Sequence, residues 1–197
     1  MTPAERRPRN QDDGVSCTIP YEPRSSVTER FHILAAVGGG DPHTFEIDTG
    51  SVGILVPRSA LGPDYQDFDP SQDIEFSYVS SGEIYKGQWV PQVAVVLGVP
   101  QAWDGTGDYP TAVIDVFAAD QAFDPQTKEW RAFDGGMFGI GFAIGGAADG
   151  GSAHNPLRHA TYQGTPLAPG YILTLQAIEL GPSTADPPAG FSLILLL

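Results

Sequence analysis

The chain has 197 residues, of which 41% are hydrophobic, and Lys+Arg 10 against Asp+Glu 24 give a net charge of -14. An acidic surface of this kind repels nucleic acid and anionic membranes, so we expect neither as a partner. Cys17 is the single cysteine, which excludes an intrachain disulfide and a cysteine-based zinc site. No apolar run approaches the roughly 20 residues that span a bilayer. The sequence therefore predicts a soluble chain without a recognisable signal peptide, and it leaves the compartment open.

The predicted elements of the first third are strands. Residues 1–23 are polar and rich in turn formers, and we expect a flexible segment there. An apolar run predicts a buried strand over 27–37, and the glycine-rich turn at 38–42 leads into a second strand over 44–48. A further apolar strand is expected over 54–57. The dispersed Gly and Pro residues between short apolar runs favour an all-β fold with few, short helices.

The rest of the chain continues this pattern. Residues 74–78 alternate apolar and polar side chains, and after a turn at 80–82 the chain returns over 83–97, which predicts a long hairpin. The remaining apolar runs are expected to be strands, at 111–118, 136–144, 171–180 and 191–197.

One short motif carries chemistry, Asp48-Thr49-Gly50-Ser51, at the end of the strand predicted over 44–48. A strand end presents a carboxylate from a rigid position. Gly50 allows the backbone to fold close beneath that carboxylate, and the hydroxyls of Thr49 and Ser51 can hold it in place. The plainer interpretation is that Asp48 only closes a turn.

The motif and its surroundings resemble the active-site turn of the pepsin-like aspartic proteases. A second segment, Met137-Phe138-Gly139, resembles the two-hydrophobics-then-glycine segment of that family. In the family this segment lies beside the active turn and completes a ψ-shaped loop. The resemblance therefore implies that Asp48 is a catalytic carboxylate and that residues 137–139 support it.

The resemblance also implies a pepsin-like β-barrel or sandwich lobe over 24–180, with a terminal strand within 181–197. In the family a flap hairpin covers the cleft and carries a Tyr near its tip. The best match to the flap is Tyr78, Ser80, Ser81 and Gly82. Phe76 and Tyr85 compete with Tyr78 for the flap position, because one sequence does not fix the hairpin register.

Two departures from the family limit this interpretation. Leu55 stands where many pepsins carry a Trp that bonds to the flap Tyr, and no second Asp-Thr-Gly or Asp-Ser-Gly follows Asp48. The family mechanism needs two carboxylates that share a proton. The second Asp must then come from a second copy of the chain or from a second lobe. A truncated two-lobed enzyme is preferred, because the interval between flap and ψ-loop is long and the final apolar run resembles an interrupted sheet.

The leading hypothesis is an aspartic endopeptidase lobe, a hydrolase that acts on polypeptide substrates and needs no cofactor. A non-catalytic peptide-binding or inhibitor domain is the alternative, and an all-β domain whose Asp48 only closes a turn is a third. His154 and His159 are expected to be solvated loop residues and not metal ligands. Dinucleotide, phosphate-loop and Gly-x-Ser-x-Gly motifs are absent from the sequence.

Overall fold

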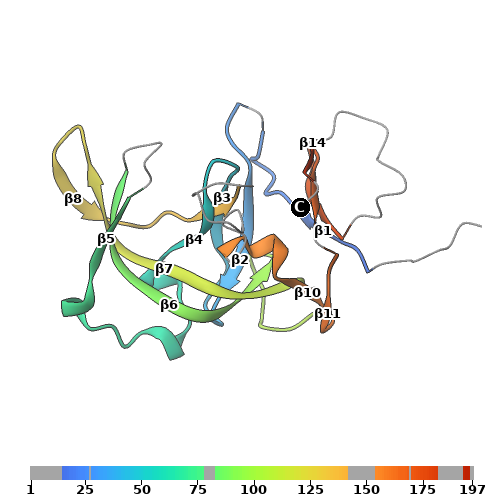
Figure 1. Ribbon diagram of the computed structural model, residues 1–197, viewed down its shortest axis with the longest axis horizontal. Coiled ribbons are helices and arrows are strands. Elements are labelled where there is room, and N and C mark those ends of the chain that lie inside the picture. Colours follow the sequence, from blue (N-terminus) through green and yellow to red (C-terminus); the bar gives the residue numbers. More distant parts are fainter. Residues whose placement is uncertain are drawn as a thin grey trace, which may run out of the picture.

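The computed structural model describes residues 15–26, 28–77, 83–141, 154–168, 170–181 and 193–195. In this part of the chain the fold is all-β, as predicted, with a closed six-stranded barrel and no helix of seven or more residues (Figure 1). Among the same residues, no helix is long and apolar enough to cross a membrane.

The barrel is closed by pairing between its first and last strands. Around its wall the strands follow in the order β7, β4, β9, β3, β2 and β6, and β6 pairs again with β7. Their bounds are β2 His32–Val37, β3 His43–Asp48, β4 Val52–Pro57, β6 Ile84–Leu97, β7 Thr111–Asp124 and β9 Met137–Ile140. A closed barrel leaves no free edge among its own strands.

Shorter elements decorate the barrel. Strand β5 pairs with β6, β8 pairs with the end of β7, and β10 pairs with the start of β7 and with β11. Their bounds are β5 Ile74–Ser77, β8 Glu129–Ala132, β10 Ala160–Tyr162 and β11 Thr165–Pro166. The helical elements of the described residues are short 3-10 turns. They are η1 Arg58–Ala60, η2 Pro63–Tyr65, η3 Pro70–Gln72 and η5 Pro156–Arg158. The expectation of short helices is met only by these turns within the described residues.

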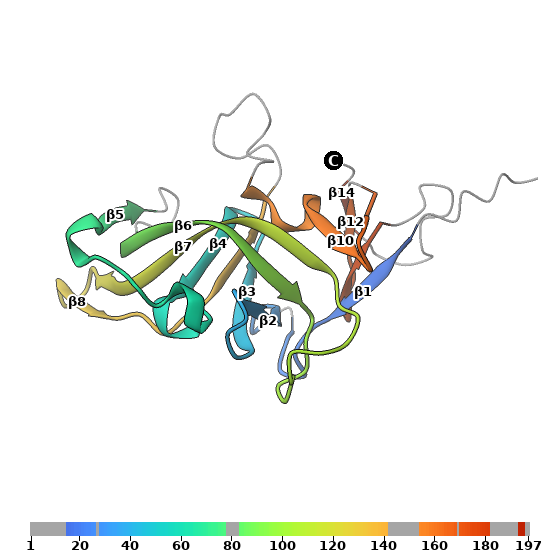
Figure 2. The same cartoon turned by 90° about the horizontal axis from the view of Figure 1, so that it is seen from below.

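A second sheet lies at the end of the barrel that is opposite the β5 and β8 hairpins (Figures 1 and 2). Its strands follow in the order β1, β13, β12, β14. Their bounds are β1 Cys17–Pro20, β12 Tyr171–Leu173, β13 Ala177–Leu180 and β14 Leu193–Leu195. Ile19, Tyr171 and Ile178 are almost fully buried and belong to the same core as the barrel interior. The sheet and the barrel therefore share one core.

Two segments differ from the sequence expectations. Strand β1 lies within the segment 1–23 that was expected to be flexible, because its one large apolar side chain, Ile19, packs into the core with no exposed surface. The apolar run 171–180 is a hairpin rather than one strand. The turn of this hairpin is closed by the Thr174 hydroxyl, which accepts from the Ala177 N–H at 3.0 Å. Leu175 lies in the turn and is 62% exposed.

Candidate active-site turn

The Asp48 turn connects β3 to β4, and β9 lies between these two strands. Asp48 is opposite Gly139 in the parallel pair of β3 and β9, and Gly53 is opposite Gly139 in the antiparallel pair of β4 and β9. The segment Met137–Ile140 is thus beside the turn, in the position that the family resemblance implies. Two strands joined by one turn, with a third strand between them, form a ψ-shaped arrangement.

Side chains along these strands alternate between the inner and outer faces of the barrel wall, and the Asp48 carboxylate lies on the outer face. Phe45 on β3 and Phe138 on β9 are fully buried inside the barrel. Residues one position away therefore face outward. Directly opposed residues of paired strands share a face, so Asp48 lies in one row with Gly139 and Gly53. The two glycines leave the wall beside the carboxylate without side chains.

Gly139 is required by close packing against the turn itself. A Cβ added there would lie 2.7 Å from Ser51 Oγ and 2.8 Å from the Val52 nitrogen. Ser51 is 3% exposed, and its carbonyl accepts from the Gly141 N–H at 2.7 Å. The backbone of β9 therefore supports the turn from below by direct contact.

The carboxylate is held differently from the sequence expectation. Asp48 Oδ1 accepts from the Gly50 N–H at 2.7 Å, whereas the Ser51 hydroxyl donates to Met137 Sδ at 3.5 Å. Thr49 is exposed. Ser51 thus links the turn to β9, and the described bond to the carboxylate comes from the backbone.

The same bond closes ordinary turns elsewhere in the chain. Asp104 Oδ1 accepts from the Thr106 N–H at 3.0 Å, and Asp69 Oδ1 accepts from the Ser71 N–H at 2.9 Å. The bond to Asp48 is therefore no sign of catalysis by itself. What distinguishes Asp48 is the strand arrangement beneath it and the surface next to it.

That surface is an apolar layer on the outer face. In the row next to Asp48, register places Glu46, Met137, Leu55, Phe117 and Trp89 opposite one another in turn. We call the apolar members and their neighbours the outer-face cluster, comprising Leu55, Tyr85, Phe117 and Ala119 with Phe76, Ala122, Phe133 and Met137 packed against them. Leu55 has no exposed surface. It therefore fills the base of this cluster.

The hairpin of β5 and β6 contributes aromatic rings to the same face. The Phe76 ring lies 5.0 Å from that of Phe117 and 5.7 Å from that of Trp89, which is 41% exposed. Tyr85 is 4% exposed, and its hydroxyl donates to Glu83 at 2.9 Å. Both competitors for the flap position thus pack within the outer-face cluster. The predicted flap residues Tyr78, Ser80, Ser81 and Gly82 lie outside the described residues, and their role stays a prediction.

Charged groups border the turn. The Arg30 guanidinium contacts both carboxylate oxygens of Glu46 at 2.6 Å. The pKa of Arg30 is raised, first by this hydrogen bond and then by the negative charges of Glu46, Glu83 and Asp48. Glu83 directly precedes β6, so the hairpin and the Asp48 turn lie within electrostatic range of the same cation.

The end of β9 is anchored by two side chains that the sequence analysis did not identify. Asn155 is 1% exposed, and its Nδ2 donates to the Ile140 carbonyl at 3.1 Å while its Oδ1 accepts from the Leu157 N–H at 3.0 Å. The Tyr171 hydroxyl donates to the same Ile140 carbonyl at 2.5 Å, and burial raises the pKa of Tyr171 to about 12. An Asn before a Pro is a cap signal, but its partner fifteen residues away leaves no local pattern.

Metal binding finds no support in the described residues, where no group of three or more His, Cys, Asp or Glu side chains is placed to hold an ion. His154 is exposed, as expected, but it lies against the site. Its ring is 5.8 Å from that of Trp89, and its Cβ is 3.7 Å from where a Cβ would stand on Gly53.

No known protein-family model matches this chain, and no curated protein sequence matches it. The family resemblance therefore depends on the residues and the geometry described above.

Proposed function

We propose that this chain is a lobe of a pepsin-like aspartic endopeptidase in which Asp48 activates the attacking water. The observation that carries the proposal is the position of Asp48. Its carboxylate stands at the end of β3, above an inserted β9, and in one row with Gly139 and Gly53, which carry no side chains. The outer-face cluster next to it offers apolar surface for the side chains of an extended polypeptide.

The chemistry requires a second carboxylate. Two close carboxylates share one proton because their like charges raise one of the two pKa values. The ionised member takes a proton from water, and the protonated member polarises the peptide carbonyl. Asp48 supplies one of these groups, and a second lobe or a second copy of the chain supplies the other.

A non-catalytic peptide-binding or inhibitor domain is the second candidate. Two observations favour it: Asp48 makes the same bond as the turn-closing Asp104, and Leu55 is fully buried in apolar packing. Such a domain would use the outer-face cluster to hold a peptide and would have no need of the carboxylate.

Asp48→Asn with Asp104→Asn as its matched control tests the proposal. Both substitutions keep a turn-closing oxygen, so neither should unfold the chain. We expect Asp48→Asn to lower the rate of cleavage of a denatured protein at acid pH by at least about a hundredfold, and Asp104→Asn to leave it unchanged. Cleavage that survives Asp48→Asn contradicts the proposal.

The concentration dependence of cleavage identifies the source of the second Asp. Activity that falls faster than in proportion on dilution indicates a second copy. A wild-type chain that binds a peptide but does not cleave it at any concentration excludes a second copy as the source, and leaves a second lobe or the non-catalytic candidate.

A further inference from the structure

Arg58 is a mostly buried cation at the end of β4 that lies away from the Asp48 turn. It directly follows β4, the strand that continues from the Asp48 turn. Its side chain is 11% exposed, and the guanidinium carbon lies 4.3 Å from the centre of the Phe68 ring. A buried guanidinium is costly unless its charge is balanced by close partners, so the groups around it show what it holds.

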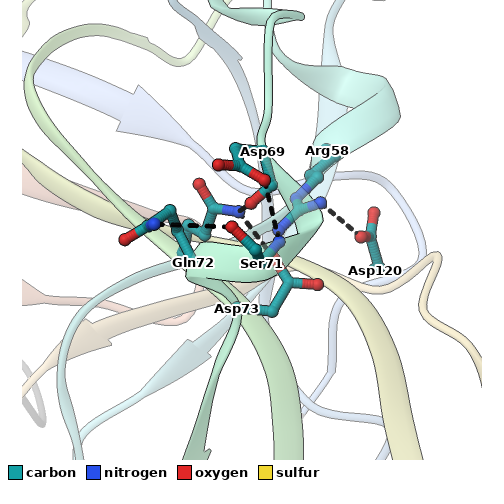
Figure 3. Close-up of polar contacts among 7 residues, drawn as sticks. Arg58, Asp69, Ser71, Gln72, Asp73 and Asp120 are labelled. Carbon is teal, nitrogen blue, oxygen red and sulfur yellow. Dashed lines mark hydrogen bonds and ion pairs between the residues drawn. The ribbon is translucent and has the colours of Figure 1, made fainter.

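Two carboxylates from different segments pair with Arg58 (Figure 3). Nη2 bonds to Asp73, which directly precedes β5, and Nη1 lies 2.5 Å from Asp120 Oδ2 on β7. A guanidinium can do this because its donors are fixed in a planar fork. Arg58 therefore connects the end of β4 with the start of the hairpin and with the barrel wall.

A β-bulge directs Asp120 to this position. In the pairing of β6 and β7, Lys86 is opposite Gln121 and Gly87 is opposite Ala119, which leaves Asp120 as the extra residue of β7. Bulges of this kind redirect a side chain from its regular face. Gly87 is needed there because a Cβ would lie 2.0 Å from the Ala118 carbonyl oxygen.

Gln88 adds the second strand of the hairpin. Its Nε2 donates to Asp73 Oδ1 at 2.6 Å and to the Asp69 carbonyl at 2.5 Å. We call Arg58, Asp73, Gln88 and Asp120 the Arg58 clamp. The clamp joins β4, β5, β6 and β7 at one place, which is the base of the hairpin whose aromatic rings lie on the outer-face cluster.

We propose that Arg58 is a positioning residue that fixes the base of the β5–β6 hairpin relative to β4 and thereby sets the place of the hairpin over the outer face. The consequence for peptide substrates rests on the proposed function. The mechanical role does not, because it depends only on the contacts of the clamp.

Amide hydrogen exchange on the full chain tests the clamp without any need for activity. Arg58→Met should raise exchange at least tenfold in β5 and in the paired part of β6, Ile84–Gly87, and leave the β2–β3 pairs unchanged. Asp73→Asn should act on the same amides. The double variant should add little to Arg58→Met, because both substitutions remove the same contact between Arg58 and Asp73. Arg30→Met is the matched control, since Arg30 is an exposed cation paired with Glu46.

A uniform rise across the barrel in Arg58→Met, or a rise no larger than in Arg30→Met, overturns the proposal. If Arg58→Met does not fold, Arg58→Lys decides: a lysine reaches only one carboxylate, so exchange must still rise selectively in β5. Where a preparation cleaves peptides, Arg58→Lys should raise KM more than it lowers kcat. Selective exchange in Arg58→Met together with cleavage that survives Asp48→Asn supports the clamp and contradicts only the proposed function.

Discussion

The residues around Asp48 set it apart from other aspartates of the chain more than its own hydrogen bond does. Asp48, Asp69 and Asp104 all accept a backbone N–H two residues ahead. Asp124, the last residue of β7, accepts the same kind of bond from the Gln126 N–H. Among these four aspartates, Asp48 alone lies in a row with a glycine on the adjacent strand β9 and another on β4, the strand beyond it. At the scale of single residues, the site depends on the absence of side chains at Gly139 and Gly53 as much as on the carboxylate of Asp48.

Gly139→Ala tests this dependence. The added methyl group would overlap Ser51 Oγ and the backbone of the turn, so we expect a loss of about 2 kcal/mol in the free energy of unfolding and a loss of any Asp48-dependent cleavage. Chemical denaturation and the cleavage assay measure the two effects. Gly135→Ala is the control, because the nearest atoms to its Cβ belong to the movable Phe133 ring. Equal stability of the two variants would show that the turn can shift to accommodate the methyl group added on β9.

At the scale of elements, β9 decides the geometry of the turn, and its C-terminal end is held from outside the barrel. The Ile140 carbonyl accepts from both Asn155, the cap residue directly before η5, and Tyr171 of the second sheet. The strand beneath Asp48 is therefore tied to segments that lie far along the chain.

Asn155→Ala should weaken this tie. The substitution removes the bond to Ile140 and leaves the buried Leu157 N–H without its acceptor. Such a loss costs about 2 kcal/mol, which denaturant unfolding would measure. Gln163→Ala, an exposed amide bonded to Asp108, should change the free energy of unfolding by less than about 0.5 kcal/mol. A similar small effect of Asn155→Ala would mean that Tyr171 alone suffices to hold β9.

Local patterns predicted the strands well and their partners poorly. The runs that became β3, β4 and the β5–β6 hairpin are apolar or alternating and are bounded by turn residues, so their existence could be predicted from the sequence. The turn within 171–180 was missed because its signal is one Thr hydroxyl inside an apolar run. The position of Met137–Ile140 beside the turn came from the family resemblance, since no local rule pairs β9 with β3.

At the scale of the whole molecule, the pairing of strands that are far apart in the chain could not be predicted from the sequence. The barrel closes through β6 and β7, and the bulge at Asp120 that completes the Arg58 clamp exists only once these strands are in register. An isolated Arg58 after Val-Pro gives no hint of its two carboxylates. The clamp is therefore a consequence of the fold and not of a motif.

The clamp makes the stability of the whole fold depend on pH. Burial opposes the ionisation of Asp73, but the hydrogen bonds from Gln88 and Arg58, the charge of Arg58 and that of Lys86 outweigh it and lower the pKa of Asp73 below 3.8. A carboxylate with a lowered pKa stabilises the fold above its unfolded pKa, and this contribution is lost as the pH falls through the folded pKa. Asp73 therefore stays ionised, and keeps its bond to Arg58, in moderately acid solution.

Asp73→Asn should therefore have a pH-dependent cost. We expect the difference in the free energy of unfolding between wild type and Asp73→Asn to be constant above about pH 5 and to shrink as the pH falls below 3.8. Urea unfolding at a series of pH values measures this difference. Ser59→Ala, a neutral and exposed neighbour of Arg58, should give a small difference that does not vary with pH. If the difference in the free energy of unfolding between wild type and Asp73→Asn stays constant down to pH 2, the negative charge of Asp73 does not contribute to the clamp, and only its size and hydrogen bonds do.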